Sequence, residues 1–165
     1  MKRLYEVLAY LIAAGVVVQA AAIAYAVFGM FAWVSTGGTI DKALIESESP
    51  QIGGIAGFNL HQLVGVTILP LLALLFLISS FFARIPRGIR WGLIIFAATV
   101  AQSLLGIYAH EDSAVGWLHG ATALILFTCA LVSGIQVNRA MAKRAPISTP
   151  QESANAAQPA HPQGT

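Results

Sequence analysis

The chain has 165 residues, of which 57% are hydrophobic and only 10% are charged, and its formal net charge is +2. A soluble domain carries about 25% charged residues, so this composition excludes an ordinary water-soluble domain and indicates contact with lipid. We expect the lipid bilayer as the main partner and no nucleic acid. The single cysteine, Cys129, excludes an intramolecular disulfide and a cluster of cysteine ligands.

Four stretches lack Asp, Glu, Lys and Arg altogether: residues 7–40, 49–83, 91–110 and 113–138. Each is long enough to cross the hydrocarbon core, which takes roughly 20 residues of helix. They predict transmembrane helices near 7–34, 54–83, 88–110 and 114–138. The first is too long for the apolar segment of a cleaved signal peptide, about 7–15 residues. We therefore expect an all-α fold, an integral membrane four-helix bundle with up-down-up-down topology.

Charge predicts the orientation of this bundle. One end of the predicted helices carries nearly all the basic residues: Lys2, Arg3, Arg84, Arg87, Arg90, Arg139, Lys143 and Arg144. The other end has Lys42 among acidic residues. By the positive-inside rule both termini are cytoplasmic. Residues 1–144 then form the membrane domain, and the Pro-, Ala-, Gln- and Ser-rich tail 145–165 is predicted to be disordered.

The two halves of the chain echo one another. When residues 16–26 are aligned with 99–109, Val17, Gln19, Tyr25 and Ala26 match identical residues at positions 100, 102, 108 and 109. The next helix of each half carries Leu-His, at positions 60–61 and 118–119. This order predicts two parallel-repeated helical hairpins, related by an axis along the membrane normal.

Depth along the helices places four polar residues in one layer. At 1.5 Å of rise per residue, His61 and His119 lie about 8–11 Å below the outer surface. Gln19 and Gln102 are about 12 Å from that surface in a core roughly 30 Å thick. Polar residues within a membrane are expensive and usually functional, so this layer is the candidate site.

Two imidazoles at matched depth on alternate helices face each other across a four-helix core. Such a pair suits a haem iron held from both sides. Gly65 and Gly120 beside them provide clearance for a flat macrocycle or allow close helix packing. Gln19 and Gln102 orient the rings or bond between helices.

His110 has two open interpretations, both at the outer water interface. It would contact a haem propionate, or it would serve as a third ligand in a zinc site with His61 and His119. Zinc is disfavoured because the two membrane histidines have no carboxylate or cysteine nearby to complete a tetrahedral site.

A family resemblance supports the haem interpretation. The segments AQSLLGIYAH and GWLHGATALILFTCALV resemble one four-helix half of the haem A synthase family, and FNLHQLVG resembles its Glu-x-x-His-Arg segment. This resemblance implies His61 and His119 as axial ligands. Phe58 stands where the family has the Glu tied to oxidation of the haem methyl group, and Gln62 replaces its Arg, so synthase chemistry is disfavoured. The chain is also similar to small four-helix membrane proteins of bacteria, which implies the bacterial inner membrane.

These observations favour a membrane protein that binds one haem b through His61 and His119 near the outer face. Its role would be electron transfer, with quinone or a redox partner protein, or haem handling. The alternative is a cofactor-free membrane accessory or interaction protein whose histidines bond between helices. A small transporter is a third hypothesis. An enzyme is less expected than a non-enzyme, and an oligomer stays open.

Overall fold

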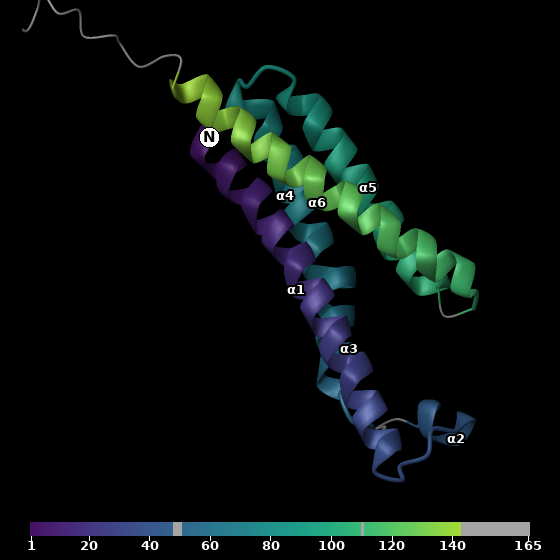
Figure 1. Ribbon diagram of the computed structural model, residues 1–165. Helices are drawn as coiled ribbons and strands as arrows, with labels where there is room; N and C mark the ends of the chain where they lie inside the picture. Colours follow the sequence, from purple (N-terminus) through teal and green to yellow (C-terminus); the bar gives the residue numbers. More distant parts are fainter. Residues whose placement is uncertain (48–50, 110, 143–165) are drawn as a thin grey trace, which may run out of the picture.

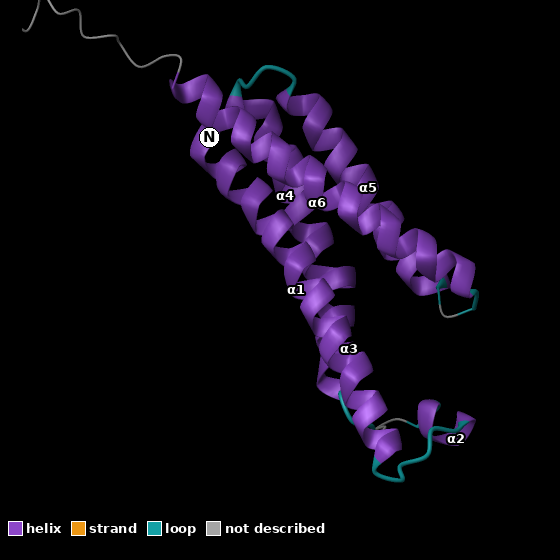
Figure 2. Cartoon of the chain, viewed as in Figure 1, coloured by secondary structure: helices purple, strands orange, loops and turns teal. Residues whose placement is uncertain are grey.

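The computed structural model describes residues 1–47, 51–109 and 111–142, with side chains as far as Val137. Within these ranges every regular element is helical (Figure 2). The elements are α1 (Lys2–Ser35), α2 (Lys42–Ile45), α3 (Ile55–Leu63), the π-helical segment η1 (Val64–Ile68), α4 (Leu69–Ala83), α5 (Gly88–Tyr108) and α6 (Ser113–Ala142). Because α3, η1 and α4 follow one another without a break, they form one span, Ile55–Ala83.

Four helices are long and apolar enough to cross a membrane: α1, the α3–η1–α4 span, α5 and the part of α6 up to Val137. Large apolar side chains remain uncovered along them, including Phe28, which is 73% exposed, and Leu124, which is 68% exposed. Apolar surface this extensive is typical of a protein that contacts lipid. The prediction of an all-α chain with four membrane-length helices is confirmed.

Two helices extend beyond the predicted bounds. α1 begins at Lys2 rather than near residue 7, and Arg3 and Glu6 form an ion pair of 3.1 Å within its first turns. α6 continues to Ala142 rather than ending near residue 138. The absence of charge marks only the part of a helix that lies in hydrocarbon, whereas backbone hydrogen bonding continues through charged residues. α5 ends at Tyr108, and the predicted tail 145–165 lies outside the described residues.

The four spans are arranged as a closed set of neighbours. α1 packs against α3 and α4, α4 against α5, α5 against α6, and α6 against α1. Figure 1 shows the start of α1 and the α4–α5 turn at the same end of the molecule. Toward the other end, where α2 lies, the pair α1–α3 diverges from the pair α5–α6 (Figure 1).

The apolar core joins all four spans. Its largest fully buried apolar side chains are Tyr5, Ile12, Phe76, Ile95 and Leu126. The rings of Tyr5 and Phe76 lie 4.4 Å apart between centroids, so α1 and α4 are in direct contact there. Burying a large apolar side chain stabilises a fold by about 1.5–3 kcal/mol in water. In lipid, where tails are as apolar as these side chains, close packing must supply most of the attraction.

Pro70 accounts for the π-helical segment in the second span. A proline has no N–H, and its ring clashes with the carbonyl four residues earlier. In η1 the backbone N–H of Leu69 bonds to the carbonyl of Val64, five residues back. The next bond of that kind would join residue 70 to Gly65, which Pro70 cannot make. The hydroxyl of Ser103 on α5 donates to the Gly65 carbonyl instead, at 2.9 Å.

Small residues let α3 approach α1 closely. A Cβ at Gly57 would lie 2.5 Å from the carbonyl oxygen of Ala22 and 3.0 Å from the Cβ of Ala26. Gly54 precedes α3 with φ of +83°, a conformation that favours glycine. These contacts bring α3 near enough to α1 for the side chain of His61, one turn after Gly57, to reach the backbone of Gln19.

Candidate functional site

His61 on α3 bonds to the helix that precedes it in the chain. Its Nδ1 lies 3.1 Å from the backbone carbonyl oxygen of Gln19 on α1. A carbonyl oxygen only accepts hydrogen bonds, so this Nδ1 carries the proton and donates it. The lone pair of the neutral ring is then on Nε2, which is the atom left to bind a metal.

His119 on α6 makes the same bond in the second half. Its Nδ1 lies 3.1 Å from the backbone carbonyl oxygen of Gln102 on α5. The side-chain amide nitrogen of Gln102 is also 3.1 Å from this Nδ1 and 3.4 Å from Nε2. Because Nδ1 donates its proton to the carbonyl, it is not an acceptor for the amide, and only the longer contact with Nε2 has matching polarity. Each half therefore ties its histidine to the backbone of its glutamine through Nδ1.

The two imidazole rings meet between the two pairs of helices. Their centroids lie 6.1 Å apart and their planes make an angle of 67°. The four residues predicted to share one layer, His61, His119, Gln19 and Gln102, are thus brought together, and all four are half-buried. A second contact between the pair α1–α3 and the pair α5–α6 is the hydrogen bond from the Ser103 hydroxyl on α5 to the Gly65 carbonyl.

The two glutamine side chains differ in their partners. The amide of Gln102 donates to the backbone carbonyl of His119 at 2.8 Å, and its Oε1 accepts from the hydroxyl of Thr122 at 2.5 Å. The Oε1 of Gln19 is buried and has no hydrogen-bond partner within the described part of the chain. The residue three positions after His61, equivalent to Thr122, is Val64, which has no hydroxyl. One half of the layer is therefore fully bonded and the other lacks a donor.

The predicted glycines have different surroundings. A Cβ added at Gly65 would clash with the amide nitrogen of Gln19, so the space beside Gly65 belongs to that side chain. A Cβ added at Gly120 would meet nothing within 4 Å. A Cβ at Gly106, which the sequence did not single out, would lie 3.1 Å from Cε1 of His119. His110 lies outside the described residues.

Thr122 and Ser103 are site residues that sequence reasoning missed. Both were signalled by their position: Thr122 is one helical turn after His119, on the same face, and Ser103 directly follows Gln102. A hydroxyl on a transmembrane helix commonly bonds to its own backbone, so position alone does not show that either reaches another helix. Thr122 also bonds to the carbonyl of Leu118, and Ser103 to that of Thr99.

Two neighbouring neutral imidazoles are the only donors of this layer that could hold a metal ion among the described residues. Within the described residues no group of three or more His, Cys, Asp and Glu is placed to hold a metal ion. A metal-bound imidazole nitrogen lies about 2 Å from the ion. Two rings that ligate one ion from opposite sides then have centroids about 6 Å apart. The 6.1 Å between the ring centroids of His61 and His119 is of this size, although the Gln102 amide, 3.4 Å from Nε2 of His119, would have to turn away before a metal could bind there.

The fold and this layer define a class, an all-helical protein with four helices able to span a membrane and a histidine pair between them. No protein-family model, curated protein or solved structure matches the chain. The residues of the layer alone therefore carry any functional conclusion.

Proposed function

We propose that this chain is an integral membrane protein that binds one haem b between His61 and His119. The observation that carries the proposal is the 6.1 Å separation of two rings whose Nδ1 atoms are both engaged by backbone carbonyls. Metal-ligating histidines usually donate their other ring N–H to a carbonyl or carboxylate, which fixes the tautomer and raises the basicity of the ligating nitrogen.

Each residue of the layer has a role in this proposal. The Gln19 and Gln102 backbones orient the two imidazoles through Nδ1, which leaves Nε2 of His61 available for iron. Nε2 of His119 would become available when the Gln102 amide, 3.4 Å away, turns off it. The Gln102 side chain, bonded to Thr122, holds α5 against α6 beside His119. The open space at Gly120 is available to the edge of a flat macrocycle, whereas Gly65 accommodates Gln19. In this proposal His110, which lies outside the described residues, would contact a haem propionate.

Electron transfer is the role that the ligand set favours. A bound haem would supply one-electron chemistry at its iron. A haem held by both His61 and His119 would have no free position for oxygen, so oxygen binding is disfavoured. Phe58, in place of the Glu expected in a haem A synthase, has no oxygen or nitrogen in its side chain, so oxidation of the haem is disfavoured too. Electrons would come from quinone or from a redox partner protein, and haem handling is the related alternative.

The proposal includes the placement in the bilayer. We infer an up-down-up-down course with two parallel-related hairpins, both termini in the cytoplasm of a bacterial inner membrane, and the histidine layer in the outer half. The acidic residues near α2 and the basic residues at the α4–α5 turn support this orientation through the positive-inside rule.

The test is the visible spectrum of the protein purified in detergent from haem-replete cells, oxidised and then reduced with dithionite. We expect the sharp reduced bands of a six-coordinate b-type haem at one haem per chain. A preparation that contains no haem and takes up none from added haemin would contradict the proposal. Carbon monoxide gives a further readout, because an iron with two imidazoles should not bind it.

One observation favours a second candidate, a cofactor-free accessory protein. Gln102, His119 and Thr122 form a closed hydrogen-bond network that is satisfied without any ligand. Polar networks of this kind hold transmembrane helices together. The same spectra distinguish the candidates, since this alternative expects a colourless protein whose stability falls when either histidine is replaced.

A further inference from the structure

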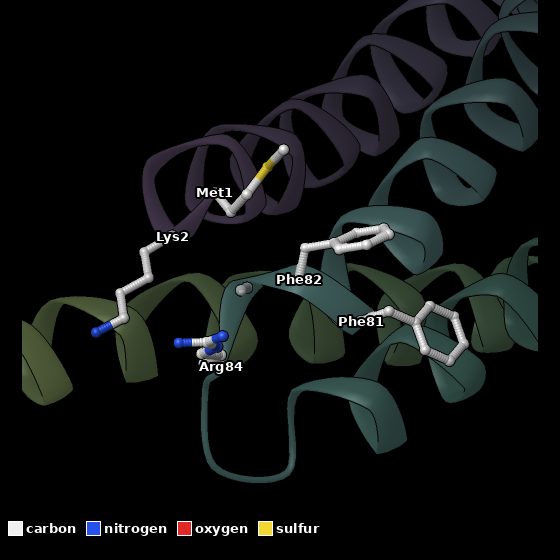
Figure 3. Close-up of a pocket in the computed structure, with 6 residues that line it drawn as sticks. Met1, Lys2, Phe81, Phe82 and Arg84 are labelled. Atoms are coloured by element: carbon white, nitrogen blue, oxygen red, sulfur yellow. The ribbon is translucent and has the colours of Figure 1, made fainter.

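A hollow lies at the basic end of the molecule, between the start of α1 and the end of α4. Its volume is about 760 Å³, and it is lined by Met1, Lys2, Phe81, Phe82, Ala83 and Arg84 (Figure 3). This volume is in the range of ligand sites, about 300–1,000 Å³. The histidine layer contributes none of these residues, so the hollow is a separate feature.

Besides the α-amino group of Met1, two cationic side chains border the hollow without a carboxylate partner in the described ranges. Figure 3 shows the side chains of Lys2 and Arg84 extending to the same side, each ending in nitrogen. Arg3, beside them in the chain, pairs with Glu6 at 3.1 Å, but neither Lys2 nor Arg84 forms such a pair among the described residues. The two charges therefore remain available to an anion.

Helix dipoles do not account for both cations. Arg84 caps the C-terminus of α4, where a positive charge is favourable. Lys2 lies in the first turn of α1, where a positive charge is unfavourable. That turn has no acidic residue and no side-chain cap. An anion in the hollow would offset the charge of Lys2 and interact favourably with the N-terminus of α1 at the same time.

Arg84 begins the turn that follows α4. Its φ is +51° and its ψ is +44°, the left-handed conformation in which helix ends favour glycine. For a residue other than glycine this backbone conformation costs roughly 1–2 kcal/mol. Arg87 in the same turn is also left-handed, with φ of +61°, and does not line the hollow, so this conformation belongs to the turn. What Arg84 contributes to the hollow is its guanidinium, the side chain best shaped to bind phosphate with two hydrogen bonds.

The remaining wall of the hollow is apolar and open. Phe81 is 55% exposed and Phe82 is 61% exposed, and Figure 3 shows both rings away from the two cations. An occupant with a negative head and an apolar tail would contact both walls at once. A soluble phosphate would use only the cationic wall.

We propose that this hollow binds the headgroup of an anionic phospholipid, with the phosphate between Lys2 and Arg84 and an acyl chain along Phe81 and Phe82. The assignment is independent of haem, because it uses no residue of the histidine layer. Basic pockets at the ends of transmembrane helices are a known mode of recognition for such lipids.

The experiment follows thermal unfolding of the full-length protein in a neutral detergent during titration with phosphatidylglycerol, phosphatidylcholine or inorganic phosphate. Phosphatidylglycerol should raise the unfolding temperature saturably, and phosphatidylcholine should not. Lys2→Gln and Arg84→Gln should each weaken the apparent affinity about five-fold. Arg90→Gln, an exposed cation at the same end that does not line the hollow, should respond as the wild type does.

Three outcomes would overturn the proposal. One is a Lys2→Gln/Arg84→Gln double variant that keeps the wild-type response to phosphatidylglycerol. Another is an equal loss in Arg90→Gln, which would indicate only diffuse attraction of charge. The third is inorganic phosphate that reproduces the whole stabilisation, which would assign the hollow to a soluble anion. If the glutamine variants do not fold, Lys2→Arg should fold and keep the response, and competition between the two lipids can be measured on the wild type by native mass spectrometry.

Discussion

The imidazole rings of His61 and His119 lie 6.1 Å apart between centroids, at an angle of 67°, although 58 positions separate them in the chain (119 − 61). Each ring is held through Nδ1 by the carbonyl of a glutamine on the preceding span. A hydrogen bond from a histidine side chain to a backbone carbonyl is kept when the side chain of the residue that provides the carbonyl is replaced. The ring positions are therefore set mainly by how α1 meets α3 and how α5 meets α6.

The first prediction concerns these two rings. If haem binds as proposed, His61→Ala and His119→Ala should each abolish its six-coordinate spectrum, because one of the two imidazoles that would hold it is removed. Adding free imidazole to either variant should restore much of the spectrum by refilling the vacated position. His161→Ala, in the C-terminal tail, serves as the control and should leave the spectrum unchanged. Unaltered spectra in both ring variants would exclude this pair as the axial ligands.

The second prediction tests the difference between Gln102 and Gln19. Thr122→Val removes the donor to Oε1 of Gln102 and should reduce the free energy of unfolding by about 0.6–2 kcal/mol. Val64→Thr offers a hydroxyl at the equivalent position beside Gln19, whose Oε1 lacks a donor, and should increase the unfolding free energy by about 0.5–1.5 kcal/mol.

Chemical unfolding in mixed micelles measures both changes. Thr128→Val is a suitable control, because among the described residues that hydroxyl bonds only to the Leu124 carbonyl of its own helix. A cost in the Thr128 variant equal to that in the Thr122 variant would contradict an interhelical role for Thr122.

The third prediction concerns the π-helical segment. Ser103→Ala leaves the Gly65 carbonyl without a donor and should lower the unfolding free energy by about 1–3 kcal/mol. Pro70→Ala restores a backbone N–H to the second span, so that this carbonyl regains a donor within its own helix. In the Pro70→Ala background the cost of Ser103→Ala should therefore shrink. A double-mutant cycle measures this coupling, and strict additivity of the two substitutions would contradict it.

The fourth prediction concerns Gly65 and Gly120, which differ in the space beside them. Gly65→Ala places a methyl group on the terminal amide of Gln19, a flexible side chain that can shift, and should destabilise the protein by about 1 kcal/mol, the low end of the cost of overpacking. Gly120→Ala meets no atom within 4 Å and should stabilise α6 by up to about 1 kcal/mol, as alanine does in a helix. Thermal unfolding of the two variants side by side provides the measurement. Equal destabilisation would mean that the neighbourhood of Gly120 is occupied.

Gly120 also bears on haem. If the open space beside it holds the macrocycle edge, a larger substitution, Gly120→Leu, should lower the haem content while leaving the haem-free protein folded. Absorbance at the haem band relative to protein concentration gives this ratio. An unchanged ratio would place the macrocycle elsewhere.

Much of the fold follows from local properties of the chain. The four membrane-length helices could be predicted from charge-free stretches because crossing hydrocarbon requires about 20 apolar residues, whatever the helices pack against. The ends of these helices could not be predicted in this way. α1 already begins at Lys2, before Glu6, and α6 continues beyond Asn138, because charged and polar residues also form helix. The π-helical segment was not predicted either, although Pro70 marked a local disturbance.

The candidate site was predicted in part. The matched order of Gln19 and His61 with Gln102 and His119 placed four residues at one depth, since position along a helix gives depth directly. The sequence alone thus determined the spans, the layer and the chemical nature of its members. Which side chains within the layer touch depends on the rotation and the separation of the helices, and these depend on packing between residues distant in sequence. Only the tertiary structure therefore decided that both rings donate through Nδ1, that Thr122 completes one glutamine while Val64 leaves the other unpaired, and that the space beside Gly65 belongs to Gln19.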